Sequence, residues 1–444
     1  MAKKAKSGYK LELSNFKQYE EIPDDWHMET LDVVGKIVGG GTPKTTIPEY
    51  WDGDILWATP SDLTTIEGNY IDDTERKITK NGLDESPVKL IEPGNLIFSS
   101  RATIGECKIN TKPVTTNQGF QNIVPKKEYE NMFVFYIVQQ NQIKFIRFAY
   151  GTTFLEISKN NIKKVKIAFP KNNAEQTKIS LILFDIDNLL SSYREILQQN
   201  KSLKKGLMQT LFTKGIGHKK FQKVTGLFRK EMKIPVGWEI KNFNEIFEFL
   251  VTGTNPRKDL GKEGDIHYIH YGDIHTQWNR FILDCESEEI PLIVKTKVKQ
   301  IPLLKEGDLI IADASEDYEG SGASILLKNV KDKKIVAGLH TFGLRIDDEI
   351  MPIDFRTYIT SNRFVKRQII SFVTGVSVYG LSKNNLKKIK ICLPKIKEQE
   401  KIGSILSKID KKIIDLETKE TNLKSLKKGL MQKLLTGQIR VVVR

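Results

Sequence analysis

The chain repeats its own sequence near the end of each half. Residues 158–167 read SKNNIKKVKI, and residues 382–391, which lie 224 positions later, read SKNNLKKIKI. Residues 203–211, LKKGLMQTL, return as LKKGLMQKL at 426–434. A repeat this long predicts one structural unit used twice, so we expect two similar halves related by a pseudo-twofold internal repeat.

The first part of each half has a pattern typical of short strands and turns. Ile-Pro-x-x-Trp occurs at 22–26 and again at 234–238, and a loop rich in Gly and Thr follows in both copies. Further on, EPGNLIFSS at 92–100 matches KEGDLIIAD at 305–313, where a glycine turn precedes an apolar run. Such runs indicate buried strands. We therefore expect a mixed α/β globular domain in each half and an α+β fold overall.

A different pattern follows each globular part. From Ile182 to Leu207 the apolar positions are spaced alternately four and three residues apart, as in the core of a coiled coil. A similar stripe runs from Ile402 to Leu434. Each stripe predicts a helix of about 38 residues, and a single helix with one apolar face is not stable alone in water. We expect the two helices to pack against each other as an antiparallel coiled coil.

Several residues are predicted to pack between these helices or against a partner subunit. They are Ile182, Ile186, Leu189, Asn200, Leu203, Gly206, Leu207, Ile409, Leu416, Leu423, Gly429 and Leu430. Asn200 is a polar residue at a core position, where such residues fix coiled-coil register. Gly206 and Gly429 each cost a helix about 1 kcal/mol relative to alanine. Two interpretations of these glycines stay open: close approach of another backbone, or a fraying helix end.

The charge of the chain points to a polyanionic partner. The 444 residues carry a formal net charge of +15, which makes nucleic acid the first candidate. A lysine-rich proteome or thermal adaptation is the alternative. The basic N-terminus has no apolar stretch behind it, no apolar run approaches the roughly 20 residues of a membrane span, and the three cysteines form no CxxC pair. We expect a cytoplasmic protein with reduced thiols.

Sequence motifs for catalysis are absent. The chain has no GxxxxGK[ST] phosphate loop, no GxSxG elbow and no Asp/Asn-Pro-Pro-aromatic motif of the amino-methyltransferases. His267, His270 and His275 look at first like metal ligands. The first copy, however, has Leu56 and Thr59 at the positions of His267 and His270, and no fourth ligand is near. We therefore predict no catalytic residue and no metal site in this chain.

Two variable domains that alternate with two closely similar helices resemble the specificity (S) subunits of type I restriction–modification systems, the HsdS family. The resemblance covers nearly the whole chain. It rests on the Ile-Pro-x-x-Trp openings and on the endings LKKGLMQTLFTKGIG at 203–217 and LKKGLMQKLLTGQIR at 426–440. The second domain departs from the pattern, with Gly-Thr-Asn-Pro where the first has Gly-Thr-Pro. The resemblance implies target recognition domains at 1–172 and 218–396, and spacer helices at 173–217 and 397–444.

The same resemblance implies a non-catalytic subunit of a hetero-oligomer. Each target recognition domain would read one half of a bipartite, gapped site in double-stranded DNA. The helices would set the spacing and bind two modification (methyltransferase) subunits, and two restriction (ATP-dependent translocase and nuclease) subunits would join them. S-adenosylmethionine, ATP and Mg would be cofactors of those partners, with none in this chain. The assembled complex would be a type I site-specific deoxyribonuclease and adenine-N6 DNA methyltransferase.

Side chains that read DNA are expected in loops that differ between the copies, because two readers on a common frame need different contacts. The predicted DNA-binding residues are Lys44, Thr45, Thr46, Ser61, Arg101, Thr103, Asn117 and Gln118 in the first domain, and Arg257, Lys258, Tyr271, His275, Ser315 and His340 in the second. Two other classes of function stay open. One is a single-chain nuclease or methyltransferase, and the other is a coiled-coil scaffold with two protein-binding domains.

Overall fold

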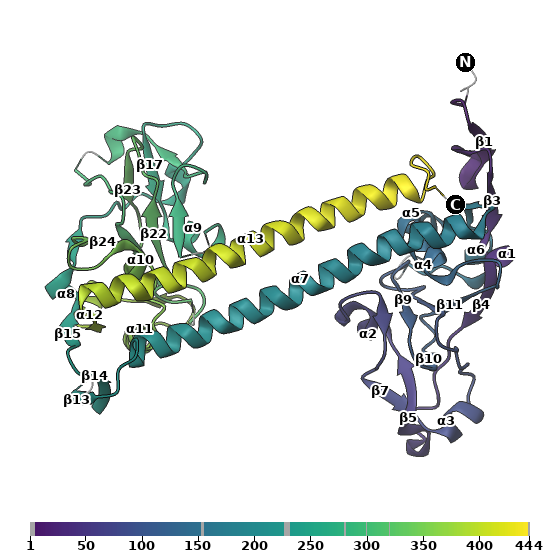
Figure 1. The fold of residues 1–444 in the computed structure, drawn as a ribbon, viewed down its shortest axis with the longest axis horizontal. Coiled ribbons are helices and arrows are strands. Elements are labelled where there is room, and N and C mark those ends of the chain that lie inside the picture. The colour runs from purple at the N-terminus through teal and green to yellow at the C-terminus, as the bar shows by residue number, and fades with distance from the viewer. Residues whose placement is uncertain are drawn as a thin grey trace. The chain divides into compact units, whose positions relative to one another are not determined.

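The computed structural model describes residues 5–151, 155–225, 231–278, 281–298, 300–318 and 320–442. It divides into two compact units. Unit 1 consists of Met1–Glu195 with Glu417–Arg444, and unit 2 of Ile196–Leu416. Each unit therefore contains one globular part and a portion of both long helices (Figure 1).

Unit 1 is built on two main sheets. The larger sheet has the order β4-β11-β8-β9-β6, with strands Gly35–Gly39, Gln121–Pro125, Leu96–Phe98, Cys107–Asn110 and Tyr70–Ile71. The smaller has the order β10-β5-β7, with strands Val114–Thr116, Trp51–Ala58 and Arg76–Ile78. Two strand pairs complete the set: β1 (Tyr9–Leu13) with β2 (Tyr19–Pro23), and β3 (Trp26–Thr30) with β12 (Lys166–Pro170). The α-helices of this globular part are α1 (Leu31–Val34), α2 (Pro60–Thr65), α3 (Lys80–Asp84), α4 (Asn131–Gln140), α5 (Gln142–Phe148) and α6 (Lys159–Lys163).

Unit 2 repeats this plan. Its larger sheet has the order β16-β24-β20-β22-β18, with strands Glu248–Leu250, Thr341–Arg345, Leu309–Ala312, Ser324–Lys328 and Ile282–Asp284. The smaller is β19-β17-β23, with strands Leu292–Ile293, Ile266–Ile269 and Ile335–Ala337. The strand pairs are β13 (Phe221–Thr225) with β14 (Glu231–Pro235), β15 (Glu239–Asn242) with β26 (Lys390–Leu393), and β21 (Ala314–Ser315) with β25 (Tyr379–Gly380). The α-helices are α8 (Phe243–Ile246), α9 (Tyr271–Thr276), α10 (Ile353–Arg356), α11 (Arg363–Phe372) and α12 (Lys383–Lys387).

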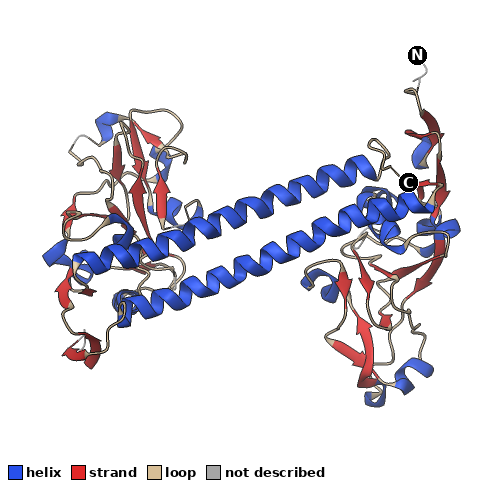
Figure 2. Cartoon of the chain, in the orientation of Figure 1, coloured by secondary structure: helices blue, strands red, loops and turns tan. Residues whose placement is uncertain are grey.

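The sense of the strands is also the same in the two units. In the smaller sheets β10 runs parallel to β5, and β23 runs parallel to β17. In the larger sheets β6 runs parallel to β9, and β18 runs parallel to β22. The other contacts within the larger sheets are antiparallel. The mixture of strands and helices that Figure 2 shows in each unit confirms the predicted α+β class and the internal repeat.

The repeated SKNN segments start short helices. The backbone N–H of Asn161 donates to the hydroxyl of Ser158 at 3.2 Å, and Asn385 donates to Ser382 at the same distance. A serine that accepts a hydrogen bond from a residue three positions later is an N-cap. The chain therefore turns through α6 or α12 before it enters the strand that closes each globular part.

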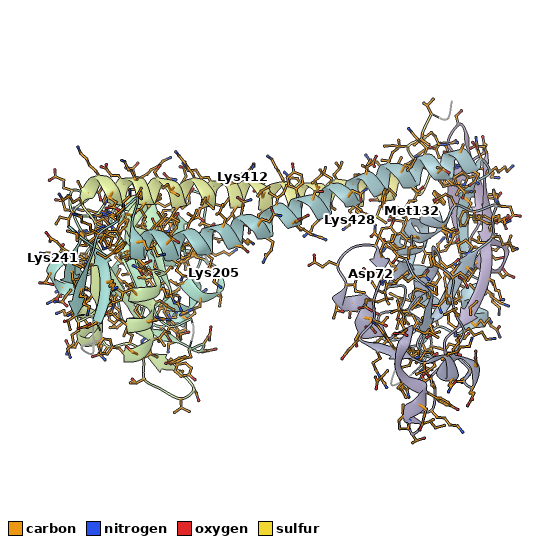
Figure 3. The ribbon with its side chains drawn as sticks, turned by 60° about the horizontal axis from the view of Figure 1, so that its bottom comes forward. Asp72, Met132, Lys205, Lys241, Lys412 and Lys428 are labelled. Carbon is orange, nitrogen blue, oxygen red and sulfur yellow. The ribbon has the colours of Figure 1, made fainter. Side chains whose placement is uncertain are left out.

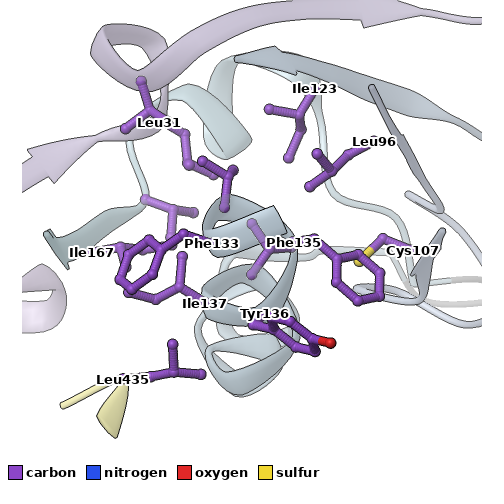
Figure 4. Close-up of a cluster of buried hydrophobic side chains, with 14 of the residues drawn as sticks. Leu31, Leu96, Cys107, Ile123, Phe133, Phe135, Tyr136, Ile137, Ile167 and Leu435 are labelled. Atoms are coloured by element: carbon purple, nitrogen blue, oxygen red, sulfur yellow. The ribbon is translucent and has the colours of Figure 1, made fainter. Parts of the chain in front are cut away.

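The core of unit 1 lies between α4, the larger sheet and the long helices. Phe133, Phe135 and Ile137 of α4 are fully buried beside Leu96 and Ile123 of the sheet (Figure 4). Burying a large apolar side chain stabilises the fold by about 1.5–3 kcal/mol, so this cluster fixes α4 on the sheet.

The long helices α7 (Asn173–Lys214, 42 residues) and α13 (Ile396–Leu434, 39 residues) pack antiparallel within each unit. In unit 1, Ile179 and Leu183 near the start of α7 share a core with Leu434 at the end of α13. In unit 2, Leu211 near the end of α7 shares a core with Ile402 near the start of α13. The predicted antiparallel arrangement is thus confirmed inside both units.

The buried face of α7 differs from the predicted stripe by one residue in each heptad. Leu183, Leu190, Leu197 and Leu211 are buried, at multiples of seven residues. Leu189 and Leu203, which were predicted to pack between the helices, are exposed. The sequence could not separate Leu189 from Leu190, since both are leucine. The sequence pattern also favoured Leu203 over Lys204, because it counts lysine as polar. In the structure the aliphatic part of the Lys204 side chain occupies the position between the helices.

The remaining predicted packing residues vary in burial. Ile182, Ile186, Asn200, Leu207, Ile409, Leu423, Gly429 and Leu430 are partly buried, and Leu416 is buried. Asn200 donates from its side chain to the carbonyl of Ile196 in its own helix at 2.7 Å. Gly206 is exposed, and a Cβ added at Gly206 or Gly429 would meet nothing within 4 Å. These glycines therefore do not mark close approach of the sister helix. In the described part of the chain no helix is long and apolar enough to cross a membrane.

Candidate nucleic-acid interface

In unit 1 the Asn117-Gln118 turn joins two of the predicted reading segments. The hydroxyl of Thr42, in the Gly-rich loop, donates to the side-chain carbonyl of Gln118. Gly119, which follows this turn, lies close to Arg101 and Pro60. A Cβ added at Gly119 would be 3.9 Å from Cδ of Arg101 and 3.5 Å from Cγ of Pro60. The turn follows the end of β10. Since β10 runs parallel to β5, both strands end at the same edge of the smaller sheet, where β5 leads into α2. The structure thus brings Asn117, Gln118 and Arg101 to one edge of the smaller sheet.

Arg101 is oriented by a carboxylate. Its Nε lies 2.9 Å from Oε2 of Glu156, and its side chain is partly exposed. The residue that follows, Ala102, has a positive φ of 56°, and the backbone N–H of Thr103 donates to the carbonyl of Arg101 at 2.6 Å. This tight turn leaves the guanidinium at the surface with donors beyond the one that contacts Glu156. Ser61, in the first turn of α2, is exposed next to Pro60.

The tip of the Gly-rich loop carries three exposed predicted residues, Lys44, Thr45 and Thr46. The carbonyl of Lys44 accepts a hydrogen bond from the indole of Trp51 at 3.3 Å, which ties the loop to β5. Arg76 stacks over the same Trp51 ring at 3.7 Å and is exposed. Sequence reasoning missed Arg76, because only the pairing of β7 with β5 brings it beside the tryptophan.

In unit 2 Arg257 is held by a buried carboxylate. Its guanidinium pairs with Asp273 of α9, whose side chain is 1% exposed, while the Arg257 side chain is 50% exposed. The other oxygen of Asp273 is buried and has no hydrogen-bond partner. Because a guanidinium has five N–H donors in a fixed fork, anchoring one edge leaves the other free to face a base or a phosphate. Lys258 is exposed beside it.

An aromatic cluster lies next to this arginine. The ring of Tyr271 lies 5.3 Å from His340 and 6.4 Å from His275, both nearly edge-on. His275 Nε2 lies 3.0 Å from the carbonyl oxygen of Ala314, and His340 Nδ1 lies 3.1 Å from Oδ1 of Asp313. Burial raises the pKa of Asp313 above its ordinary value, although the nearby His340 opposes this shift. His340 has a positive φ of 55°, so a tight turn presents its ring.

One predicted reading residue lies inside the unit. Ser315 is 2% exposed, and its hydroxyl donates to the carbonyl of Asp317 at 2.7 Å. Its side chain therefore shapes the turn that follows β21 and does not reach the surface. The sequence showed only a polar loop at this place, because burial of a serine leaves no trace in composition.

The three histidines considered as metal ligands have separate local contacts. His270 Nδ1 accepts the backbone N–H of Gly272 at 3.2 Å and caps α9, and burial lowers the pKa of its imidazole. His267 Nδ1 lies 3.2 Å from the carbonyl oxygen of Ile290. Across the described ranges, no group of three or more His, Cys, Asp or Glu side chains is placed to hold a metal ion.

The two candidate interfaces occupy equivalent places in the repeat and differ in chemistry. In both, a short helix follows the central strand of the smaller sheet, with a buried aspartate in its first turn, Asp62 or Asp273. Asp62 accepts the backbone N–H of Thr59 at 2.7 Å and closes a capping box. Asp273 instead binds Arg257. The same frame thus presents amides and a glutamate-bound arginine in unit 1, and histidines, a tyrosine and an aspartate-bound arginine in unit 2.

Comparison with known proteins places this architecture in a family. The model of the type I restriction modification DNA specificity domain matches residues 23–201 and 235–425. The chain is 28% identical over 441 residues to the type I restriction enzyme MjaIX specificity subunit of Methanocaldococcus jannaschii, with 95% of each chain covered. It is also 28% identical over 211 residues to the EcoR124I/EcoR124II specificity subunit of Escherichia coli, with 46% of this chain and 50% of that protein covered.

A solved structure has the same fold over its whole length. The S subunit of a type I restriction-modification system from M. genitalium superposes with a TM-score of 0.56 at 16% sequence identity. The match covers 98% of this chain and 99% of the other. At this identity the likeness concerns the fold, including the use of one unit twice.

Proposed function

This chain belongs to the type I restriction modification DNA specificity family, and on that premise we propose that it is the non-catalytic subunit that gives a type I restriction–modification complex its DNA sequence specificity. The observation that carries the proposal is the pair of equivalent sheet edges with different side chains. A repeated frame with diverged contacts is what two readers of different sequences need. The net charge of +15 supports a polyanionic partner.

Each globular part acts as a target recognition domain for one half of a bipartite, gapped site. In unit 1 the readers are Arg101, Asn117, Gln118, Ser61 and the loop tip at 44–46, with Thr103 supporting the Arg101 turn. In unit 2 they are Arg257, Lys258, Tyr271, His275 and His340. Both domains present an arginine, which pairs with guanine through two hydrogen bonds. Only unit 1 also presents an asparagine and a glutamine, which pair in the same way with adenine, so the two domains favour different sequences.

The long helices dock two modification subunits. Their surface carries exposed apolar residues: Leu203 is 53% exposed and Leu426, its counterpart 223 residues later, is 51% exposed. Gly206 and Gly429 lie three residues after these leucines and leave open space for an approaching backbone. Two equivalent surfaces suit two copies of one partner, because a repeated docking face binds repeated subunits.

The chemistry resides in the partners. The modification subunits use S-adenosylmethionine to methylate adenine at N6. Two restriction subunits use ATP and Mg for translocation and cleavage. The assembly works in the cytoplasm, where its DNA substrate lies. The isolated chain is expected to show neither methyl transfer nor cleavage.

A domain exchange tests the modular reading of DNA. Residues 20–155 are replaced by the corresponding segment of the M. jannaschii relative, the complex is reconstituted with its modification subunits, and methylated sites are sequenced. We expect one half of the recognised site to change while the other half and the gap stay the same. A single continuous site, or a change in both halves, would refute the proposal.

A further inference from the structure

Unit 2 contains a cleft with strongly cationic walls. The cleft has a volume of about 660 Å³. One wall is the last part of α7, with Lys201, Lys204 and Lys205, and the other is α11, with Arg363, Lys366 and Arg367. Among the described residues that line the cleft there is no aspartate or glutamate. Figure 3 labels Lys205 on the α7 side of this unit.

The spacing on both walls is the same. Lys201, Lys204 and Lys205 follow an i, i+3, i+4 pattern, and so do Arg363, Lys366 and Arg367. Residues at this spacing lie on one face of a helix, where like charges destabilise it by a few tenths of a kcal/mol per pair. Two cationic faces across one cleft therefore repel each other unless an anion lies between them.

Internal contacts hold some of these cations in place and leave others available. The Lys204 ammonium pairs with Asp410 and lies 4.2 Å from the centre of the Phe281 ring. Lys366 Nζ donates to the carbonyl of Ser321 at 2.6 Å. Lys205, Arg363 and Arg367 are exposed, and no side-chain hydrogen bond or ion pair holds them within the described residues. Lys205, Arg363 and Arg367 are therefore placed to contact a ligand.

The cleft adjoins the unit 2 interface. A second hollow, of about 290 Å³, begins at Ile274 of α9 and shares Phe281, Ser361 and Lys366 with the cationic cleft. The same helix α9 carries Tyr271 and His275. A polyanion that lies against these reading residues can thus extend along a hollow surface to the cationic walls.

Unit 1 repeats only the α7 wall of this cleft, because Lys424, Lys427 and Lys428 of α13 stand 223 residues after Lys201, Lys204 and Lys205. When Phe148 is aligned with Phe372, the positions of Arg363, Lys366 and Arg367 hold Gln139, Gln142 and Ile143. The amide of Gln142 donates to the carbonyl of Ile104 at 2.9 Å. The cationic wall of α11 is therefore specific to the second half of the repeat, and general charge of the chain does not explain it.

We propose that this cleft binds the phosphodiester backbone of duplex DNA beside the half-site that unit 2 reads, an inference that rests on the proposed function. Lysine and arginine contacts to phosphates release condensed cations, so each contact makes binding more dependent on salt. Contacts to DNA phosphates therefore contribute more to the binding of the half-site that unit 2 reads than to the binding of the half-site that unit 1 reads. Base identity is read at the sheet edge, and the cleft adds affinity and fixes the direction of the duplex.

The test is the salt dependence of DNA binding by the full chain. The variant Lys205→Gln/Arg363→Gln/Arg367→Gln is compared with Lys408→Gln/Lys411→Gln/Lys412→Gln, which removes the same charge from exposed positions of α13 outside the cleft. Dissociation constants for a fluorescent mixed-sequence duplex are measured over a series of salt concentrations. The slope of log K against log salt should become shallower by about 2 to 3 in the cleft variant, at about 0.9 per phosphate contact. The control variant should keep the slope of the unchanged chain.

The outcomes separate this inference from the proposed function. If the unchanged chain binds no DNA even at low salt, the DNA-reading function itself is refuted. If it binds with a steep slope that the cleft variant retains, only the cleft assignment is overturned. If the cleft variant keeps the slope but no longer assembles with the modification subunits, the cleft binds an acidic protein surface instead. Unchanged circular dichroism of the cleft variant shows that the loss is not one of folding.

Discussion

Asp187 on α7 accepts a hydrogen bond of 2.6 Å from the hydroxyl of Tyr136 on α4. The same carboxylate binds Lys427 of α13 at 2.6 Å. Unit 2 repeats the arrangement: Tyr358 donates to Asp410 at 2.5 Å, and Asp410 pairs with Lys204. Each trio joins both long helices to one globular part at a fixed place along the seam. Burial, followed by the hydrogen bond to the aspartate, raises the pKa of each tyrosine far above its ordinary value, so both stay protonated donors.

These trios fix the register of the helix pair, and the first prediction tests this. Lys427→Met removes the cation and leaves the Asp187 carboxylate, which is 15% exposed, with neutral donors alone. Leaving such a charge unpaired should destabilise unit 1 by about 3 kcal/mol. Adding Asp187→Leu should recover about 1–2 kcal/mol, because the two residues are coupled. Urea unfolding of the single and double variants measures both quantities.

The control for that experiment is Lys428→Met, next to Lys427 and exposed. It should change the unfolding free energy by less than about 0.5 kcal/mol. Strict additivity of the Lys427 and Asp187 changes would show that the pair does not act as a unit.

The second prediction concerns acid sensitivity in unit 2. Burial of Glu398 tends to raise the pKa of its carboxyl, but hydrogen bonds from the Ile216 backbone N–H, His218 and Trp238 together lower this pKa below its ordinary value of 4.5. A carboxylate with a lowered pKa adds stability above its unfolded pKa and loses it as the pH falls through the folded value. The free energy of unfolding of unit 2 should therefore decrease as the pH drops below about 4.5.

Glu398→Gln tests this assignment. The variant should be less stable at neutral pH and should lose part of the acid dependence, which thermal unfolding between neutral and acidic pH measures. Glu400→Gln, an exposed neighbour on the same helix, is the matched control. If the stability of Glu398→Gln decreases in acid as much as that of the unchanged chain, groups other than Glu398 cause the pH dependence.

The third prediction addresses base reading by Arg257. Arg257→Gln should weaken binding of the recognised site by about 1–3 kcal/mol and relax specificity at one base pair of the unit 2 half-site. Asp273→Asn keeps the arginine but weakens its anchor, so it should give a smaller loss at the same base pair. Sequencing of methylated sites measures both effects.

Lys262→Gln is the control, since Lys262 is exposed in the same loop region and has no side-chain partner among the residues described. It should lower affinity equally for all sites. A uniform loss in Arg257→Gln, without relaxed specificity, would make Arg257 a phosphate contact.

The fourth prediction concerns the helix surface. Leu203→Asp together with Leu426→Asp should abolish binding of the modification subunits, because a docked apolar face cannot accept an unpaired charge. Stability of the chain itself should change little, since both side chains are about half exposed. Co-purification and unfolding measurements report the two properties separately. Val236→Asp, a comparably exposed apolar position, should leave assembly intact.

The sequence by itself determined the repeat, the class of fold, the two long antiparallel helices and the family. These follow from periodicity and from matching segments, which record local propensity and the alternation of apolar and polar residues. The predicted reading loops also contain side chains that the structure brings together, such as Gln118 beside Thr42 and Tyr271 beside His340. These residues stay predicted DNA contacts, and the same rule also selected Ser315, which is buried.

Only the tertiary structure decided which side of each helix is buried and which polar residues have partners. Leu189 and Leu190 are the same residue type, and in the folded unit Leu190 is buried while Leu189 is exposed. Lys204 occupies a seam position because Asp410 and Tyr358 meet it there, and Arg76 reaches the candidate interface only through strand pairing. Such contacts join residues far apart in the chain, and their free energy depends on burial and geometry that no local pattern contains.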